Sequence, residues 1–253
     1  IMPSLVGSEM CIRDRYILFF GLDTKKMLFS AIELKIGRRC IKIVVSNQHG
    51  GILRGGSAMA TSAQVRDEIL AGKWDETLGA LYGGGAAELR RQRARYAAAL
   101  EQFELYFGPG RQVRLYSAPG RTELGGNHTD HQHGYGLAAA VTLDLIAVAS
   151  PSDDGFIRVK SRGFNKLDVI DLSEPEPQQG ESTHSASLIR GIAEGFRALG
   201  KETGGFDAYT ASDVLRGSGL SSSAAFEMGM AVVLNGELSL IHISEPTRLG
   251  MIS

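Results

Sequence analysis

A short run of glycines and serines between residues 214 and 225 constrains this chain more than any other feature. It reads Val-Leu-Arg-Gly-Ser-Gly-Leu-Ser-Ser-Ser-Ala-Ala. The alanines, and the Glu and Met residues that follow them, are good helix formers, and a serine directly before such a run is a typical N-cap. The pattern therefore predicts a glycine-rich loop that leads directly into a helix.

A loop of this kind offers several groups that can bind an anion. The first turn of a helix carries free N–H groups and the positive end of the helix dipole. Glycines let the backbone approach a ligand, and serine hydroxyls add donors and potential Mg²⁺ ligands, a combination that suits a nucleotide phosphate. An ordinary Gly/Ser turn before a capped helix fits the loop alone equally well. No Gly-Lys-Ser/Thr follows, so the loop is not of the Walker type, and the Rossmann spacing fits poorly.

Composition narrows the class of protein. A chain of 253 residues with 43% hydrophobic residues can build a sizeable core in one or two domains. The net charge of −1 comes without a basic stripe, which argues against nucleic acid as a partner. No apolar run approaches the roughly 18–20 residues that a membrane span needs. The two cysteines, Cys11 and Cys40, offer no disulfide framework and fit a reducing compartment such as the cytoplasm.

The two ends of the sequence differ in character from the rest. Residues 1–15 and 239–253 resemble translated sequencing-adaptor DNA, and only from Met59 does a coherent pattern begin. We therefore expect 1–58 and 239–253 to be non-native, with 59–105 forming leading helices and 106–238 forming the main domain. Within the upstream part, Ile41–Val45 has the pattern of a strand.

From Met59 onward, hydrophobic periodicity and turn residues indicate helices and strands in succession. One or two helices are expected in 64–82 and single helices in 86–107 and 186–199; strands are expected at 113–117, 137–141, 145–149, 157–160, 167–170 and 206–210. The apolar faces of the two longer helices contain Leu89, Tyr96, Leu100, Phe103 and Tyr106, and Leu188, Ile189, Ile192, Phe196 and Leu199. The charge run from Arg90 to Arg95 is interpreted as a solvated helix face. Consecutive strands with separate helices predict an α+β fold rather than a doubly wound parallel sheet.

A second polar segment, residues 117–134, reads SAPGRTELGGNHTDHQHG. Arg121 offers a fixed fork of hydrogen-bond donors. Four further side chains can each hold a hydroxyl group: Glu123, Asn127, His128 and Asp130. The glycines among them allow close approach of a ligand to the backbone. One interpretation is a pocket for a sugar alcohol beside a phosphoryl-transfer site.

A metal site is the rival interpretation of this segment. His128, Asp130, His131 and His133 are all potential ligands, which would make the chain a metal-dependent hydrolase. Distant partners are scarce, because only His184 remains outside the two suspect ends. Ordinary solvated turn residues are a third interpretation, one that fits His131 and His133 better than the segment as a whole.

Taken together, the two segments resemble the GHMP kinase superfamily, and galactokinases in particular. The galactokinase motif has the form Gly-Arg-x-Asn-Leu-Ile-Gly-Glu-His-Thr-Asp-Tyr, and residues 120–131 read Gly-Arg-Thr-Glu-Leu-Gly-Gly-Asn-His-Thr-Asp-His. The family's phosphate loop, Gly-x-Gly-Leu-Ser-Ser-Ser-Ala, matches residues 217–224. The resemblance covers about residues 106–238. It implies the α+β amino-terminal domain of these kinases, with the ribosomal protein S5 domain 2-like fold.

The resemblance also implies an activity, the phosphorylation of the anomeric hydroxyl of α-D-galactose by ATP with Mg²⁺. Arg121 would be the catalytic residue near the reacting hydroxyl, with Glu123, Asn127, His128 and Asp130 binding the sugar. The phosphates of ATP would be held by Gly217, Ser218, Gly219, Leu220, Ser221, Ser222 and Ser223, and Ser223 would also bind Mg²⁺.

The sequence departs from the family pattern at positions that bear on the site. The usual Asn and Glu are exchanged, as Glu123 and Asn127, and the usual Tyr is His131. The Pro before the phosphate loop is Leu215. The exchange keeps one carboxylate and one amide in the segment, which is compatible with sugar binding, although Asn127 cannot supply a carboxylate.

The family's catalytic Asp and its Mg²⁺-binding Glu lie downstream of the phosphate loop. After Glu227 the chain offers only Glu237 and Glu245 as carboxylates. We therefore expect an amino-terminal fragment that lacks the carboxy-terminal domain and is inert by itself. Two other hypotheses stay open beside the hydrolase: a kinase for another hexose, mevalonate or homoserine, and a non-catalytic sugar sensor. The match at 128–130 favours a hexose.

Overall fold

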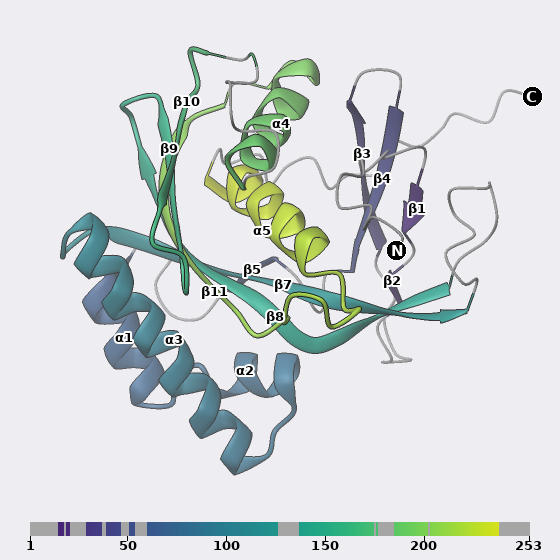
Figure 1. Ribbon diagram of the computed structural model, residues 1–253. Coiled ribbons are helices and arrows are strands. Elements are labelled where there is room, and N and C mark those ends of the chain that lie inside the picture. Colours follow the sequence, from purple (N-terminus) through teal and green to yellow (C-terminus); the bar gives the residue numbers. More distant parts are fainter. Residues whose placement is uncertain are drawn as a thin grey trace, which may run out of the picture.

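The computed structural model describes residues 15–17, 19–20, 29–36, 39–46, 51–53, 60–125, 137–174, 176, 185–201 and 203–237 (Figure 1). Its main sheet has the strand order β10-β9-β11-β8-β7-β5. These strands are β5 (Gly51–Leu53), β7 (Gln112–Gly125), β8 (Leu137–Ser152), β9 (Phe156–Ser161), β10 (Leu167–Asp171) and β11 (Gly205–Ser212). Within this order β11 and β9 pair in parallel, and every other neighbouring pair is antiparallel.

Shorter strands lie upstream. The strands β2 (Phe19–Phe20) and β6 (Ala60–Thr61) pair with β8 and β7, and a separate sheet has the order β1 (Arg15–Ile17), β4 (Arg39–Ser46), β3 (Phe29–Ile36). The strand β4 confirms the one predicted over Ile41–Val45.

Helices cover both faces of the main sheet (Figure 1). On one face lie α1 (Ser62–Leu70), α2 (Asp75–Tyr82) and α3 (Ala86–Phe107), and on the other lie α4 (Ser185–Ala198) and α5 (Ser222–Glu237). The mostly antiparallel sheet with helices grouped by sequence confirms the predicted α+β class.

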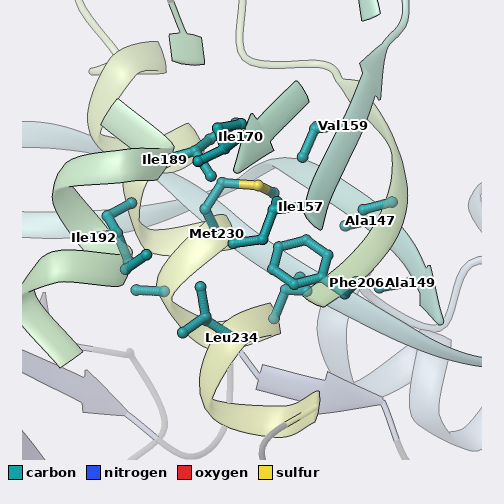
Figure 2. Packing of buried hydrophobic residues seen from close by; sticks show 14 of the residues in the cluster. Ala147, Ala149, Ile157, Val159, Ile170, Ile189, Ile192, Phe206, Met230 and Leu234 are labelled. Carbon is teal, nitrogen blue, oxygen red and sulfur yellow. The ribbon is translucent and has the colours of Figure 1, made fainter. Parts of the chain in front are cut away.

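The strand β8 divides two hydrophobic cores because successive side chains point to opposite faces. Leu145 and Ala147 pack with α4 and α5, whereas Ile146 and Val148 pack with the layer of α1, α2 and α3. Figure 2 shows the first core, in which Met230 of α5 lies among isoleucines from β9, β10 and α4. Burial on both faces makes β8 the centre of the domain.

Local signals set the helix ends. Thr61 caps α1 in a capping box, with its hydroxyl accepting a hydrogen bond from the Gln64 amide at 3.3 Å while the Gln64 side chain accepts one from Thr61 N at 3.0 Å. The helix α3 ends at Gly108, whose φ of 89° lies in the left-handed region that favours glycine.

Three expectations differ from the structure. The two strands predicted at 137–141 and 145–149 are one continuous strand, β8, because Asp144, expected in a break, lies within it as a buried residue. The predicted strand at 113–117 continues into the polar segment as far as Gly125. Leu199 and Tyr106, expected on buried helix faces, are 43% and 47% exposed. Leu199 follows the last residue of α4, and the Tyr106 ring stacks on that of Tyr209 near the end of α3.

The charge run of α3 is also not simply a solvated face. Arg90 and Arg91 are exposed, but the Arg95 side chain is only 6% exposed and forms an ion pair with Asp144. This part of the prediction was wrong, because a carboxylate on the facing strand compensates the charge of a buried guanidinium.

Candidate active site

The glycine-rich loop runs from Asp213 to Ser221 and joins β11 to α5. Gly217 and Gly219 adopt left-handed backbone conformations, with φ of 72° and 75°. Apart from the glycine itself and its chain neighbours, no described atom lies within 4 Å of the position that a Cβ would take on either residue. The glycines therefore provide both the sharp turns and an open backbone surface that a ligand can approach.

The loop ends where α5 begins, as the sequence predicted. The Ser221 carbonyl accepts the first intrahelical hydrogen bond, from Ala225 N at 3.0 Å, so Ser221 occupies the N-cap position. Ser221 has a φ of 58°, which is uncommon for a residue other than glycine. The amides of Ser222, Ser223 and the next residue precede that first bond and belong to the helix terminus that attracts anions.

The strand β7 meets this loop at Arg121. The Arg121 amide donates to the Leu220 carbonyl at 3.0 Å, and Arg121 Nε donates to the Ser221 hydroxyl at 3.0 Å. These contacts join two segments that are 100 positions apart in the sequence. The two polar segments singled out in the sequence therefore adjoin at Arg121 and Ser221.

Gly120 makes this approach possible. A Cβ there would lie 3.1 Å from the Leu220 carbonyl oxygen and 3.1 Å from a methyl group of Val214. The pairing of β7 with β8 is also irregular between Pro119 and Arg121. Such irregularities bend a strand and change the direction of its side chains, and they are common beside active sites.

Positive charge surrounds the loop. Besides Arg121, the loop itself carries Arg216, which is exposed and whose guanidinium lies 4.6 Å from the centre of the Phe164 ring. Together with the amino terminus of α5, these cations favour an anionic ligand.

The predicted phosphate-binding residues 217–223 are all described, and they form the loop and the first two residues of α5. Among the predicted sugar-binding residues, Glu123 lies in β7, where only its backbone is described. Asn127, His128 and Asp130 fall outside the described residues, as do the other candidate metal ligands His131, His133 and His184.

Sequence reasoning missed the polar residues beneath the site. Asp144 is 2% exposed and accepts hydrogen bonds from Tyr82 at 2.6 Å, from Ser117, and from Arg95 at 2.6 Å. Burial, and then the nearby Asp144 carboxylate, raise the pKa of Tyr82 well above its usual value. Burial alone would lower the pKa of Arg95, but Asp144, together with Tyr82 and Asp213, more than offsets this effect and the pKa is raised. The available signal was an aspartate inside an apolar strand, which requires a buried partner.

Two features are absent from the described part of the chain. No group of three or more His, Cys, Asp or Glu side chains there is arranged to hold a metal ion. No helix among the described residues is long and apolar enough to cross a membrane.

Comparison with known proteins gives matches in both halves of the site. The model of the galactokinase galactose-binding signature matches residues 101–151, and the model of the GHMP kinase N-terminal domain matches residues 187–250. Galactokinase from Lactococcus lactis subsp. lactis is 33% identical over 57% of this chain and 36% of the relative. Galactokinase from Chloroflexus aurantiacus is 38% identical over 51% of this chain and 32% of the relative.

A solved structure agrees with these sequence matches. The Lactococcus lactis galactokinase complexed with galactose has a TM-score of 0.53 and 30% identity, covering 60% of this chain and 39% of the other. The described part of the chain thus has the mixed α/β fold of the GHMP kinase N-terminal domain. By sequence, the chain is similar to galactokinases over about half of its length. It spans about a third of the length of the curated relatives that it matches.

Proposed function

We propose that the intact gene product is a galactokinase, which transfers the γ-phosphoryl group of ATP to the anomeric hydroxyl of α-D-galactose. The observation that carries this proposal is the contact of Arg121 with Ser221, because it joins the galactokinase-type segment to the glycine-rich loop. A phosphoryl acceptor and a phosphoryl donor held by these two segments would lie next to each other, as transfer requires.

The loop residues fit the phosphates of ATP. Gly217 and Gly219 present open backbone, and α5 presents its amino terminus. Ser221 and Ser222 add hydroxyl groups, and Ser223, exposed in the first turn of α5, offers an oxygen to Mg²⁺. When bound, ATP with Mg²⁺ supplies the phosphoryl group and neutralises part of its charge.

Arg121 has the catalytic role in this proposal. Its Nε is occupied by Ser221, and the rest of its guanidinium fork remains a fixed positive charge beside the loop. Such a charge stabilises the negative charge that develops on the transferring group. Glu123, Asn127, His128 and Asp130 hold the sugar hydroxyls, a role that rests on the family match over residues 101–151.

A coupled assay of ADP release by the intact gene product tests the proposal. The acceptors are galactose, glucose, mannose, mevalonate and homoserine, each with ATP and Mg²⁺. We expect galactose to give the highest kcat/KM. Equal or greater activity on mevalonate or homoserine would replace the assignment by another small-molecule kinase. Galactose binding without turnover of any acceptor would indicate a sugar sensor, and acceptor-independent phosphate release would indicate a hydrolase.

A further inference from the structure

The buried guanidinium of Arg95 connects the two segments of the site from the opposite face of the sheet. Arg95 lies on α3, and its side chain is only 6% exposed. It donates to the Asp144 carboxylate at 2.6 Å, to the Asp144 carbonyl at 2.9 Å and to the Ala211 carbonyl at 3.3 Å. Its Nε lies 3.2 Å from the carboxylate of Asp213. One side chain thus contacts both β8 and the end of β11.

Two of these partners, Asp144 and Asp213, each connect Arg95 to one of the two segments of the site. Asp144 accepts a hydrogen bond from Ser117, which lies on β7 four residues before Arg121. Asp213 is the first residue of the glycine-rich loop, and its amide donates to the Asp144 carbonyl at 2.9 Å. Val214 follows and contacts the strand at Gly120.

Two other arginines hold Asp213 from the periphery. Arg91 pairs with its carboxylate at 3.1 Å and Arg162 at 3.0 Å, and their side chains are 50% and 49% exposed. Ion pairs that involve half-exposed arginines of this kind contribute little to stability. Arg162 also donates to the Ser212 carbonyl of β11 at 3.0 Å. Among these three arginines, Arg95 is the buried one whose described contacts include Asp144, so it links the base of the loop to β7 through Asp144 and Ser117.

We propose that Arg95 is a positioning residue, which sets the glycine-rich loop at the correct distance from Arg121 for phosphoryl transfer. This proposal goes one step beyond the proposed function and rests on it for its kinetic consequence. Arg95 contacts neither reactant. It acts through Asp213 and Val214 on one side, and through Asp144 and Ser117 on the other.

The test compares two variants of the intact protein on the same helix. Arg95→Lys keeps the charge beside Asp144 but loses the planar fork, so it retains compensation of the buried carboxylate. Arg93→Gln is the matched control, because Arg93 pairs with Asp75 of α2 and makes no contact with the loop among its described interactions. Thermal unfolding followed by circular dichroism identifies a temperature at which the wild type and both variants are folded.

Two measurements are then made. Hydrogen–deuterium exchange of peptides covering residues 213–222 measures the positioning itself and needs no activity. We expect faster exchange there in Arg95→Lys and wild-type exchange in Arg93→Gln. Steady-state kinetics with galactose should show kcat lowered roughly ten- to hundredfold in Arg95→Lys, as for a misplaced reacting group, with KM for galactose within about twofold of the wild type.

The outcomes separate the two proposals. Unchanged exchange at 213–222 in Arg95→Lys would overturn the positioning role whatever the kinetics show. A kcat of Arg95→Lys within twofold of the wild type would also overturn the positioning role. So would equal losses of kcat in Arg95→Lys and Arg93→Gln. A wild-type protein that phosphorylates no galactose would overturn the proposed function, while faster exchange in Arg95→Lys would still support the control of the loop by Arg95.

Discussion

Arg121, the proposed catalytic residue, is held in place by contacts with two parts of the fold. Its backbone amide is bound to Leu220 and its side chain to Ser221, so its position is set by the glycine-rich loop as well as by β7. A guanidinium fixed in this way pays little reorganisation cost when charge develops on a phosphoryl group.

At the residue scale, we predict that Arg121→Ala lowers kcat of the intact protein more than it raises KM for galactose. The lost interaction is made in the transition state, and such losses appear in kcat. Loss of a comparable electrostatic donor costs roughly 10²–10³-fold in kcat. Arg197→Ala serves as the control, because Arg197 lies at the end of α4 and pairs with Glu194. If only KM rose, Arg121 would be a ground-state sugar contact.

Single residues also show where sequence reasoning succeeds and fails. The loop serine before the helix was recognised, because N-caps and helix formers are local signals. Arg95 was misinterpreted, because its partner Asp144 is 49 positions away and no local pattern reveals such a pairing. Asp144 was predicted to lie in a break between two strands, whereas it is buried within β8.

At the element scale, the approach of β7 to the glycine-rich loop depends on the small size of Gly120. A Cβ there would crowd the Leu220 carbonyl and Val214, each at 3.1 Å. We predict that Gly120→Ala displaces the loop, lowers the free energy of unfolding by about 1–3 kcal/mol and raises KM for ATP several-fold.

The matched control for this change is Gly191→Ala within α4, where the new methyl group would have no described atom within 4 Å other than its chain neighbours and the adjacent helix backbone. That substitution should raise the free energy of unfolding by about 0.5–1 kcal/mol, because alanine is the better helix former. Urea titrations and ATP saturation curves measure both effects. A Gly120→Ala protein with wild-type KM for ATP and wild-type stability would show that the two elements are less closely packed than described here.

Elements bounded by strong local signals were predicted best. Glycines on both sides of the helix over 86–107 fixed its limits, and the structure has α3 over the same residues. Strands that run past polar residues were predicted less well, because β7 and β8 owe their length to pairing with each other. Sheet pairing is a long-range interaction that a single sequence does not display.

In the whole molecule, the sheet brings two distant motifs together in space. The sequence shows only the order of these motifs along the chain. The family resemblance predicted that the segments at 120–131 and 217–224 act together, and the structure brings Arg121 and Ser221 into contact. The roles of Glu123, Asn127, His128 and Asp130 stay predictions, because three of these residues lie outside the described part and the fourth is described only by its backbone.

The proposed galactokinase activity requires this site to direct a phosphoryl group to the anomeric oxygen of galactose. The most direct test is ³¹P NMR of the product formed by the intact protein from galactose, ATP and Mg²⁺. We predict one new phosphomonoester signal, coupled to the anomeric proton of the sugar, that grows in step with ADP. A signal coupled to any other sugar position, or ADP formed together with inorganic phosphate alone, would contradict the account.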